Sequence, residues 1–234
     1  MDLSTLQQLN AARDARRAVA LVTDLGDGRG MAITEGETMP EALAASVATA
    51  FLTGKAVTAD IDGRSVFINA YLPPPRIVVI GAVHISQALA QLAPVTGYDL
   101  TIIDPRTAFA TPERFAGVDL IAEWPEDALR ARPLDSYTAV AAVTHDPKID
   151  DFALSAALSA GCFYVGALGS RKTHAKRVER LVALGHSQAE IARISAPIGL
   201  DIGAASPAEI ALATLGDIVR AFRRRSLASG QGDA

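Results

Sequence analysis

The chain has 234 residues, of which 50% are apolar and 21% are charged, and its formal net charge is −4. Such a composition is that of one large or two small globular domains, each able to bury a core. The acidic balance, with a pI of about 5.6, supplies no positive field for a nucleic-acid backbone, so we expect no nucleic-acid partner. No apolar run reaches the roughly 20 residues of a membrane span, and residues 1–17 do not have the pattern of a signal peptide. We therefore expect a cytoplasmic protein without a membrane partner.

The single cysteine, Cys162, excludes an internal disulfide framework and any cysteine-rich zinc or iron–sulfur site within one chain. Cys162 follows a glycine and adjoins an apolar run, a pattern that favours a buried small side chain over a sulfur carrier. The cysteine content predicts no metal site.

Residues 1–72 are predicted to form a small α+β domain. Leu3, Leu6 and Leu9 recur at helical spacing, and Pro40 opens a second helix that runs to about Phe51. Short apolar runs predict four strands, the last two joined by an Asp-Gly hairpin signal: residues 19–22, 31–33, 57–61 and 65–70.

Three consecutive prolines, residues 73–75, remove backbone donors and favour an extended segment, so we place the domain boundary there. Beyond it, residues 76–226 alternate helices with short strands that are apolar on both faces. This pattern predicts a Rossmann-like α/β fold, a parallel sheet with helices on both faces. The expected strands are residues 77–80, 100–103, 118–121, 139–143 and 163–168.

The last helix has a clear start signal, because Ser206 is a good N-cap, Pro207 suits the first helical position and Glu209 closes a capping box. The helix should run to about Arg224, and residues 227–234 are expected to be a flexible tail.

The first strand of the second domain leads into a loop where a nucleotide-binding turn is expected, with Gly81, Ala82 and His84 as candidate contacts. The G-x-G-x-x-G pattern keeps its first glycine alone. Val83 stands at the second position, where a β-branched side chain obstructs close approach of a pyrophosphate. His84 is equally well explained as a loop histidine.

The second strand ends at Asp104, 23 residues after Gly81, where an acidic residue in this fold can accept hydrogen bonds from a ribose. Arg106 could meet a phosphate. The alternative is that both belong to a polar turn.

The fourth strand ends in a dense group of titratable residues, and ligands of open α/β sheets bind at this edge. Thr144 and His145 are candidate ligand contacts. No catalytic residue is assigned, but His145, Asp146 and Asp150 are candidates, since a histidine flanked by aspartates can act as a general base, a metal ligand or an orienting donor. The aspartates could instead cap the next helix.

After the fifth strand, a glycine turn leads into a helix whose first residues are basic. Cations are unfavourable at a helix N-terminus unless an anion joins them, so this local conflict predicts an anionic ligand. The candidate contacts here are Gly166, Gly169, Ser170, Arg171, His174 and Lys176. A solvated basic helix is the alternative. Asp201 and Gly203 lie in a later glycine-containing loop, where structural and ligand-contacting roles are both open.

Five segments together resemble the XdhC/CoxF family of accessory proteins, in their order and spacing across residues 76–224. They read GAVHISQAL, IDPR, THDPKIDDFAL, FYVGALGSRKTHAKR and APIGLDIGAASPAEIAL. The resemblance implies a maturation factor that binds molybdenum cofactor, as molybdopterin or its dinucleotide form, and assists its sulfuration and insertion. The client would be a xanthine dehydrogenase or carbon monoxide dehydrogenase type molybdoenzyme of the xanthine oxidase family.

The resemblance further implies a cofactor chaperone rather than an enzyme, with a sulfur donor as an additional partner. Family members often have GAGH where this chain has Gly81-Ala82-Val83-His84, and many carry an N-terminal cysteine motif that residues 23–37 lack. A homodimer is expected from the apolar small domain.

Two other functions compete with this one. An NAD(P)-dependent oxidoreductase is favoured by Asp104 and opposed by Val83 and by the absence of an evident Tyr-x-x-x-Lys pair. A non-catalytic nucleotide-binding regulator would hold a phosphate at the basic helix without contacting a molybdoenzyme.

Overall fold

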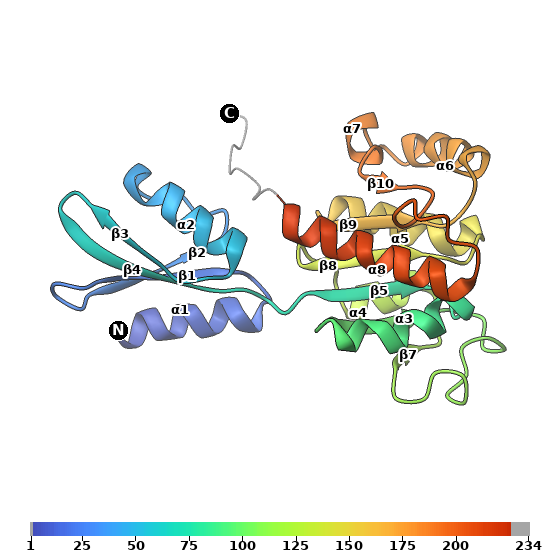
Figure 1. The fold of residues 1–234 in the computed structure, drawn as a ribbon, viewed down its shortest axis with the longest axis horizontal. Coiled ribbons are helices and arrows are strands. Elements are labelled where there is room, and N and C mark those ends of the chain that lie inside the picture. The colour runs from blue at the N-terminus through green and yellow to red at the C-terminus, as the bar shows by residue number, and fades with distance from the viewer. Residues whose placement is uncertain (1, 226–234) are drawn as a thin grey trace. The chain divides into compact units, whose positions relative to one another are not determined.

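The computed structural model describes residues 2–225, and the chain separates into two compact units (Figure 1). Among the described residues, one unit contains residues 2–73 together with residues 223–225, and the other is Pro74–Phe222. The predicted flexible tail, residues 227–234, lies outside the described residues.

The N-terminal unit is built on an antiparallel four-stranded sheet in the order β2-β1-β4-β3. Its elements are α1 (Leu3–Asp14), β1 (Val19–Asp24), β2 (Gly30–Thr34), α2 (Glu41–Thr53), β3 (Val57–Ile61) and β4 (Arg64–Tyr71). The strands β1 and β2 pair antiparallel, and the predicted hairpin of β3 and β4 also forms. Asp62 and Gly63 both have positive φ, 52° and 77°, in the turn that joins the second pair. The predicted α+β architecture is confirmed.

The buried face of α1 differs from the leucine stripe in the sequence. Leu9 is buried, but Leu3 is 70% exposed and Leu6 is 36% exposed. The face that packs on the sheet runs instead through Thr5, Leu9 and Ala12, which are four and three residues apart and therefore lie on one side of the helix.

The second unit contains a six-stranded parallel sheet in the order β10-β9-β8-β5-β6-β7. Its elements are β5 (Arg76–Ile80), α3 (His84–Val95), β6 (Asp99–Ile103), β7 (Asp119–Ile121), α4 (Pro125–Ala131), β8 (Thr138–Ala142), α5 (Pro147–Ser159), β9 (Tyr164–Ala167), α6 (Arg171–Ala183), α7 (Gln188–Ile191), β10 (Ile194–Ser195) and α8 (Pro207–Arg224). This is the doubly wound strand order of the Rossmann fold, so the predicted fold class is confirmed. The sixth strand, β10, was not predicted.

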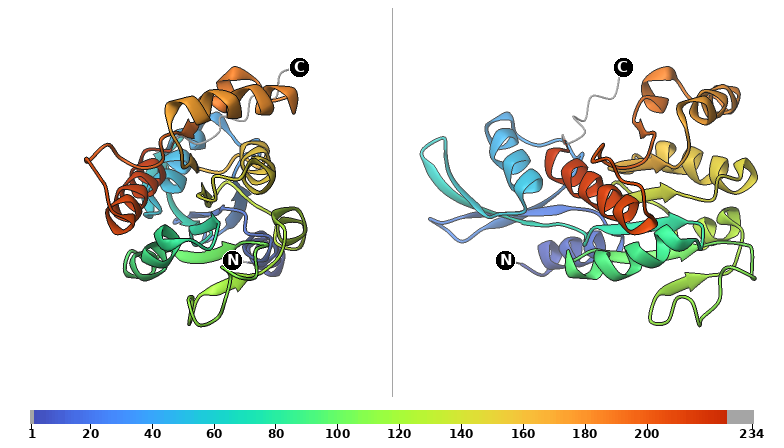
Figure 2. Two further views of the ribbon diagram at one scale, coloured as in Figure 1. Left: turned by 90° about the vertical axis from the view of Figure 1, so that its right-hand side faces the viewer. Right: turned by 45° about the vertical axis from the view of Figure 1, so that its right-hand side comes forward.

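Two hydrophobic layers cover the two faces of this sheet. In β5, Ile77 and Val79 face the layer that includes α3 and α8, whereas Val78 and Ile80 face the layer that includes α4, α5 and α6. The left view of Figure 2 shows α3 and α8 on one side of the strands and α4 and α5 on the other. Burial on both faces explains why the strands read as continuous apolar runs.

The predicted start of α8 is confirmed. The Glu209 carboxylate accepts hydrogen bonds from the amides of Ser206 at 2.8 Å and Ala205 at 2.9 Å, and the Glu209 amide donates to the Ser206 hydroxyl at 3.3 Å. These bonds satisfy amides that a helix start leaves without partners.

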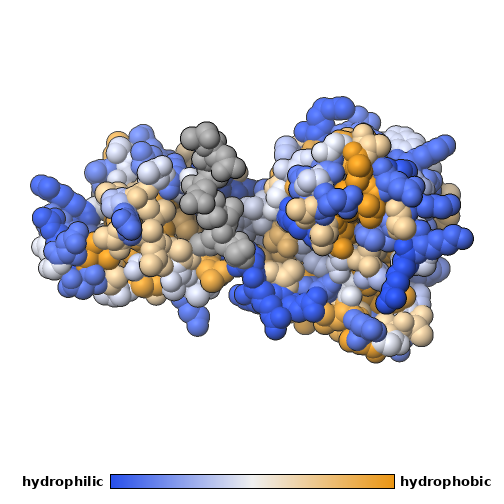
Figure 3. Space-filling model, turned by 90° about the horizontal axis from the view of Figure 1, so that it is seen from above, coloured by the Kyte–Doolittle hydropathy of each residue, from blue (hydrophilic) through white to orange (hydrophobic). Residues whose placement is uncertain are grey.

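No helix among residues 2–225 is long and apolar enough to cross a membrane. On the face drawn in Figure 3, hydrophilic side chains are interspersed with smaller groups of apolar ones.

Candidate functional site

The carboxyl ends of β5, β6, β8 and β9 lie at one edge of the parallel sheet. The loops that follow these strands begin at Gly81, Asp104, Val143 and Leu168. Because β5 lies between β6 and β8, the chain winds in opposite directions from this point, which is where open α/β sheets bind ligands. Most of the predicted contacts are thus brought to one edge.

Two amides of the loop between β5 and α3 donate to side chains of the protein. The Ala82 amide donates to the Asp104 carboxylate at 2.7 Å, and the Val83 amide donates to the Ser86 hydroxyl at 3.4 Å. The Ser86 hydroxyl, fully buried, in turn donates to the Gly81 carbonyl. Ser86, at the third glycine position of the fingerprint, therefore closes the loop. His84 is exposed at the first position of α3.

Asp104 is fully buried and accepts four hydrogen bonds. One comes from Ala82, and three come from the backbone and guanidinium of Arg106 at 2.8–2.9 Å. Burial acts to raise the pKa of Asp104, but the hydrogen bonds outweigh it and the pKa lies below its ordinary value. The Arg106 guanidinium also lies over the Phe109 ring, 4.7 Å from its centroid. The predicted ribose contact of Asp104 and phosphate contact of Arg106 stay predictions. The four hydrogen bonds that Asp104 accepts already occupy the lone-pair sites of its carboxylate.

The ends of β5 and β8 touch at Gly81 and Thr144. Gly81 has φ of +120°, and a Cβ on it would lie 2.8 Å from the Thr144 methyl carbon, so a side chain cannot be placed there without a shift. The Thr144 hydroxyl donates to the Asp150 carboxylate at 2.7 Å and accepts from the Asp146 amide at 3.0 Å. Thr144 thus connects the first loop to the start of α5.

His145 is exposed and has φ of +63°, a left-handed conformation that is uncommon for residues other than glycine. Thr144, just before His145, is bonded to Asp146 and Asp150, which both follow it, so these bonds close the loop around His145. Asp146 is the N-cap of α5, accepting from the Lys148 amide at 3.0 Å, so the capping alternative is realised for this residue. A catalytic role for His145, Asp146 or Asp150 stays a prediction.

Asp150 lies beneath Thr144 and is 1% exposed. Its Oδ1 accepts from Thr144, but its Oδ2 is buried without a hydrogen-bond partner. Burial raises the pKa of Asp150 to about 6, against the opposing effects of the Thr144 bonds and the Arg177 charge. A carboxyl group in this setting can change its protonation state near neutral pH.

The start of α6 is strongly basic and carries no acidic residue in its first turn. Ser170 caps the helix by accepting from the Thr173 amide at 3.2 Å, and Gly169 before it has φ of +132°. Arg171 and Lys176 are exposed. The first amides of a helix have no acceptor within it, and they add to the local positive potential.

Arg177 also belongs to this site, although it was not among the predicted contacts. The side chain is 2% exposed, donates from Nη2 to the Leu168 carbonyl at 2.9 Å, and approaches His174 Nδ1 at 3.5 Å. Its Nε is buried without a partner. Burial lowers the pKa of Arg177, and burial together with the Arg177 charge lowers that of His174. Helical spacing offered a signal, because Arg177 is four residues before the buried Leu181.

The remaining predicted contacts lie elsewhere. Gly166 is inside β9, where a Cβ would lie 2.6 Å from the Tyr164 ring and 2.8 Å from Ile198, so its small size serves packing. Asp201 and Gly203 are exposed in the loop between β10 and α8. Among the described residues, no hydrogen bond or ion pair joins Gly166, Asp201 or Gly203 to the loops that contain Thr144 and Ser170.

Cys162 is fully buried, and burial raises the pKa of its thiol to about 12. The prediction of a buried small side chain is confirmed. Within residues 2–225, no group of three or more His, Cys, Asp or Glu residues is placed to hold a metal ion.

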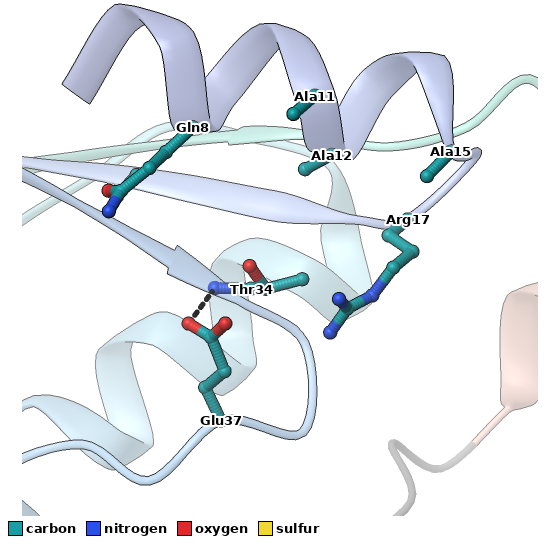
Figure 4. A pocket seen from close by; sticks show the side chains of 8 residues that line it. Gln8, Ala11, Ala12, Ala15, Arg17, Thr34 and Glu37 are labelled. Carbon is teal, nitrogen blue, oxygen red and sulfur yellow. Dashed lines mark hydrogen bonds between the residues drawn. The ribbon is translucent and has the colours of Figure 1, made fainter. Parts of the chain in front are cut away.

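A separate hollow of about 270 Å³ lies in the N-terminal unit, between α1 and β2 (Figure 4). Alanines contributed by both elements form much of its wall, and Gln8, Arg17 and Glu37 supply polar groups. Glu37 is held by the Thr34 amide at 2.9 Å. None of the predicted contacts lies in this hollow.

The comparison with known proteins places the second unit in a family. The family described as the XdhC Rossmann domain matches residues 77–218. A Bacillus subtilis protein described as a probable subunit of xanthine dehydrogenase is 32% identical over 161 residues, 68% of this chain and 47% of that protein. The molybdenum cofactor insertion chaperone PaoD of Escherichia coli is 33% identical over 152 residues, 65% of this chain and 42% of that protein.

The uncharacterized protein YqeB of Escherichia coli is 32% identical over 171 residues, 70% of this chain and 31% of that protein. The matches thus span less than half the length of these curated relatives. A solved structure described as a xanthine dehydrogenase of Bacillus halodurans shares the fold, with a TM-score of 0.62 and 21% identity over 97% of this chain and 68% of that one. Together these matches show that the chain belongs to the XdhC family and carries its Rossmann domain in residues 77–218.

Proposed function

We propose that this protein is an accessory factor that binds molybdenum cofactor, as molybdopterin or its dinucleotide form, and assists its sulfuration and insertion into a molybdoenzyme of the xanthine oxidase family. Family membership supports a role of this kind, since one relative is described as a molybdenum cofactor insertion chaperone. The client enzyme, a sulfur donor and a second copy of the chain are its proposed partners.

The start of α6 is the observation that carries this proposal. A phosphate there would accept from free helix amides and offset the repulsion among Arg171, Lys176 and the helix dipole. Arg177 adds a buried cation with an unpartnered Nε, which approaches the same loop through the Leu168 carbonyl. The phosphate end of a pterin cofactor matches this donor set in charge and hydrogen-bonding type.

The first test is to purify the chain from cells that make molybdenum cofactor and to assay the denatured protein for pterin and molybdenum. We expect stoichiometric pterin. A preparation without pterin that instead retains a nicotinamide nucleotide would contradict the proposal and favour an NAD(P)-dependent oxidoreductase.

Replacing the exposed cations at α6 tests the place of binding. We expect Arg171→Ala and Lys176→Ala each to weaken cofactor binding by about 1.5–3 kcal/mol, the range for a lost charge-assisted contact. The matched control is Arg130→Ala, which removes an exposed cation from the last turn of α4. Bound pterin is measured at a fixed cofactor concentration in the three variants. Equal retention in all of them would remove α6 from the site.

A further inference from the structure

We propose that Asp150 and Arg177 form a buried, proton-linked pair beneath the α6 site, so that an anion binding at the start of α6 draws a proton onto Asp150. The proposal rests on the anion site argued above and adds a regulation of that site by pH. It concerns two side chains that the family match alone does not explain.

Both side chains are buried and incompletely bonded. Asp150 is 1% exposed and Arg177 is 2% exposed. Asp150 Oδ2 and Arg177 Nε are among the few buried side-chain atoms in the described residues that have no hydrogen-bond partner. A buried polar group left without a partner is destabilising, and more so when it is charged. A change in protonation, or in the charge nearby, therefore has a large effect here.

The two groups are attached to neighbouring loops. Asp150 is bonded to Thr144, just beyond β8, and Arg177 is bonded to Leu168, just beyond β9. The two strands are adjacent and parallel, and the Leu168 amide donates to the Ala142 carbonyl at 2.8 Å. Asp150 and Arg177 therefore lie beneath adjoining parts of the same sheet edge.

An incoming anion would compete with Asp150 for the positive charge of Arg177. Arg177 acts to lower the pKa of Asp150, and Asp150 acts to keep Arg177 charged. An anion at the start of α6 would provide Arg177 with a second negative partner and would repel the Asp150 carboxylate. Since burial already raises the pKa of Asp150 to about 6, a further rise moves it toward neutral pH, where the carboxylate then takes up a proton.

Other charged groups face this pair from the surrounding elements. On α5, Asp151 is paired with Arg180 of α6, and Asp146 caps the helix. His174 of α6 approaches Arg177. The pKa of Arg106, beyond β6, is raised mainly by its bond to Asp104 and further by the charges of Asp146 and Asp150. Burial and the Arg177 charge lower the pKa of His174, and its imidazole can also exchange a proton, so the test must separate it from Asp150.

The test is titration of the full chain with sulfate, which stays a dianion between pH 6 and 8. Calorimetry at pH 7 in two buffers of different protonation enthalpy gives the number of protons taken up. We expect the wild type to take up a fraction of a proton and to lose affinity as the pH rises, by up to about tenfold for each unit by which binding raises the pKa.

Three variants assign the proton. Asp150→Asn mimics the protonated acid, so it should bind sulfate without the proton uptake that Asp150 supplies. Asp151→Asn removes the neighbouring carboxylate and His174→Asn removes the imidazole, and both should retain uptake. Uptake that is unchanged in Asp150→Asn, or absent in the wild type while sulfate binds, overturns this inference alone. No sulfate binding in any of the proteins overturns the α6 anion site and this inference with it.

Discussion

At the edge of the parallel sheet, single residues mainly fix one another's positions through packing and hydrogen bonds. The absence of a side chain at Gly81 leaves room for Thr144, Thr144 is bonded to the Asp150 carboxyl and the Asp146 amide, and His145 within this loop has a positive φ. A strained residue that presents an exposed imidazole at a ligand-binding edge is a reason to look for function there. The same chain of contacts predicts where a small substitution disturbs the site most.

Gly81→Ala should destabilise the second unit more than an alanine at another positive-φ glycine. The new Cβ would meet Thr144 at 2.8 Å as well as occupy φ of +120°. Gly117→Ala is the matched control, since its φ is +76° and no atom lies within 4 Å of a Cβ. We expect about 1 kcal/mol of lost stability for Gly117→Ala from the left-handed strain and more than about 2 kcal/mol for Gly81→Ala. Urea unfolding of both variants measures the difference, and equal losses would remove the steric argument.

At the scale of elements, the sequence predicts those helices, strands and turns that depend on a local pattern of residues. The strands of the parallel sheet, the hairpin at residues 62–63 and the start of α8 follow from apolar runs, turn residues and a capping box. The strand β10 has two residues, too few to show a pattern. Its place is set by pairing with β9.

The candidate site divides in the same way. The basic start of α6 was visible because first-turn cations conflict with the helix dipole whatever the tertiary structure. The burial of Asp150 and Arg177 could not be predicted from the sequence, because it depends on how α5 and α6 pack on the sheet. Charged residues are also rarely so buried. Asp104 is partly predictable, since its position at the end of β6 was predicted but its hydrogen bonds to Arg106 were not.

The conflict at α6 makes a prediction about the helix as a whole. Lys172→Glu places an acid at the second position of α6, where it should stabilise the helix by about 0.3–1 kcal/mol while weakening anion binding. Lys148→Glu is the matched control at the second position of α5, a helix that already begins with Asp146 and Asp150. Thermal unfolding and sulfate titration of both variants give the two quantities. A Lys172→Glu protein that is less stable, or that binds sulfate unchanged, would contradict the account of α6.

At the scale of the whole molecule, stability depends on pH through carboxyl groups that shift in opposite directions. The pKa of Asp104 is lowered, so its contribution is present above the unfolded value of 3.8 and is lost as the pH falls. The pKa of Asp150 is raised, so its contribution is present below 3.8 and is lost as the pH rises through about 6. The lowered pKa of His174 favours the folded state above its unfolded value of 6.5.

The difference between wild type and Asp150→Asn isolates one of these groups. Asparagine stays neutral, so the wild type should lose stability relative to the variant between pH 4 and pH 7. The pKa rises from 3.8 to about 6, and one pKa unit is worth about 1.4 kcal/mol, so the relative loss is about 3 kcal/mol at most. Free energies of unfolding in urea at several pH values measure it. Asp104 and His174 titrate in both proteins and cancel in the comparison. Parallel pH profiles would mean that the pKa of Asp150 is the same in the folded and unfolded protein, so that the Thr144 bonds and the Arg177 charge fully offset the effect of burial.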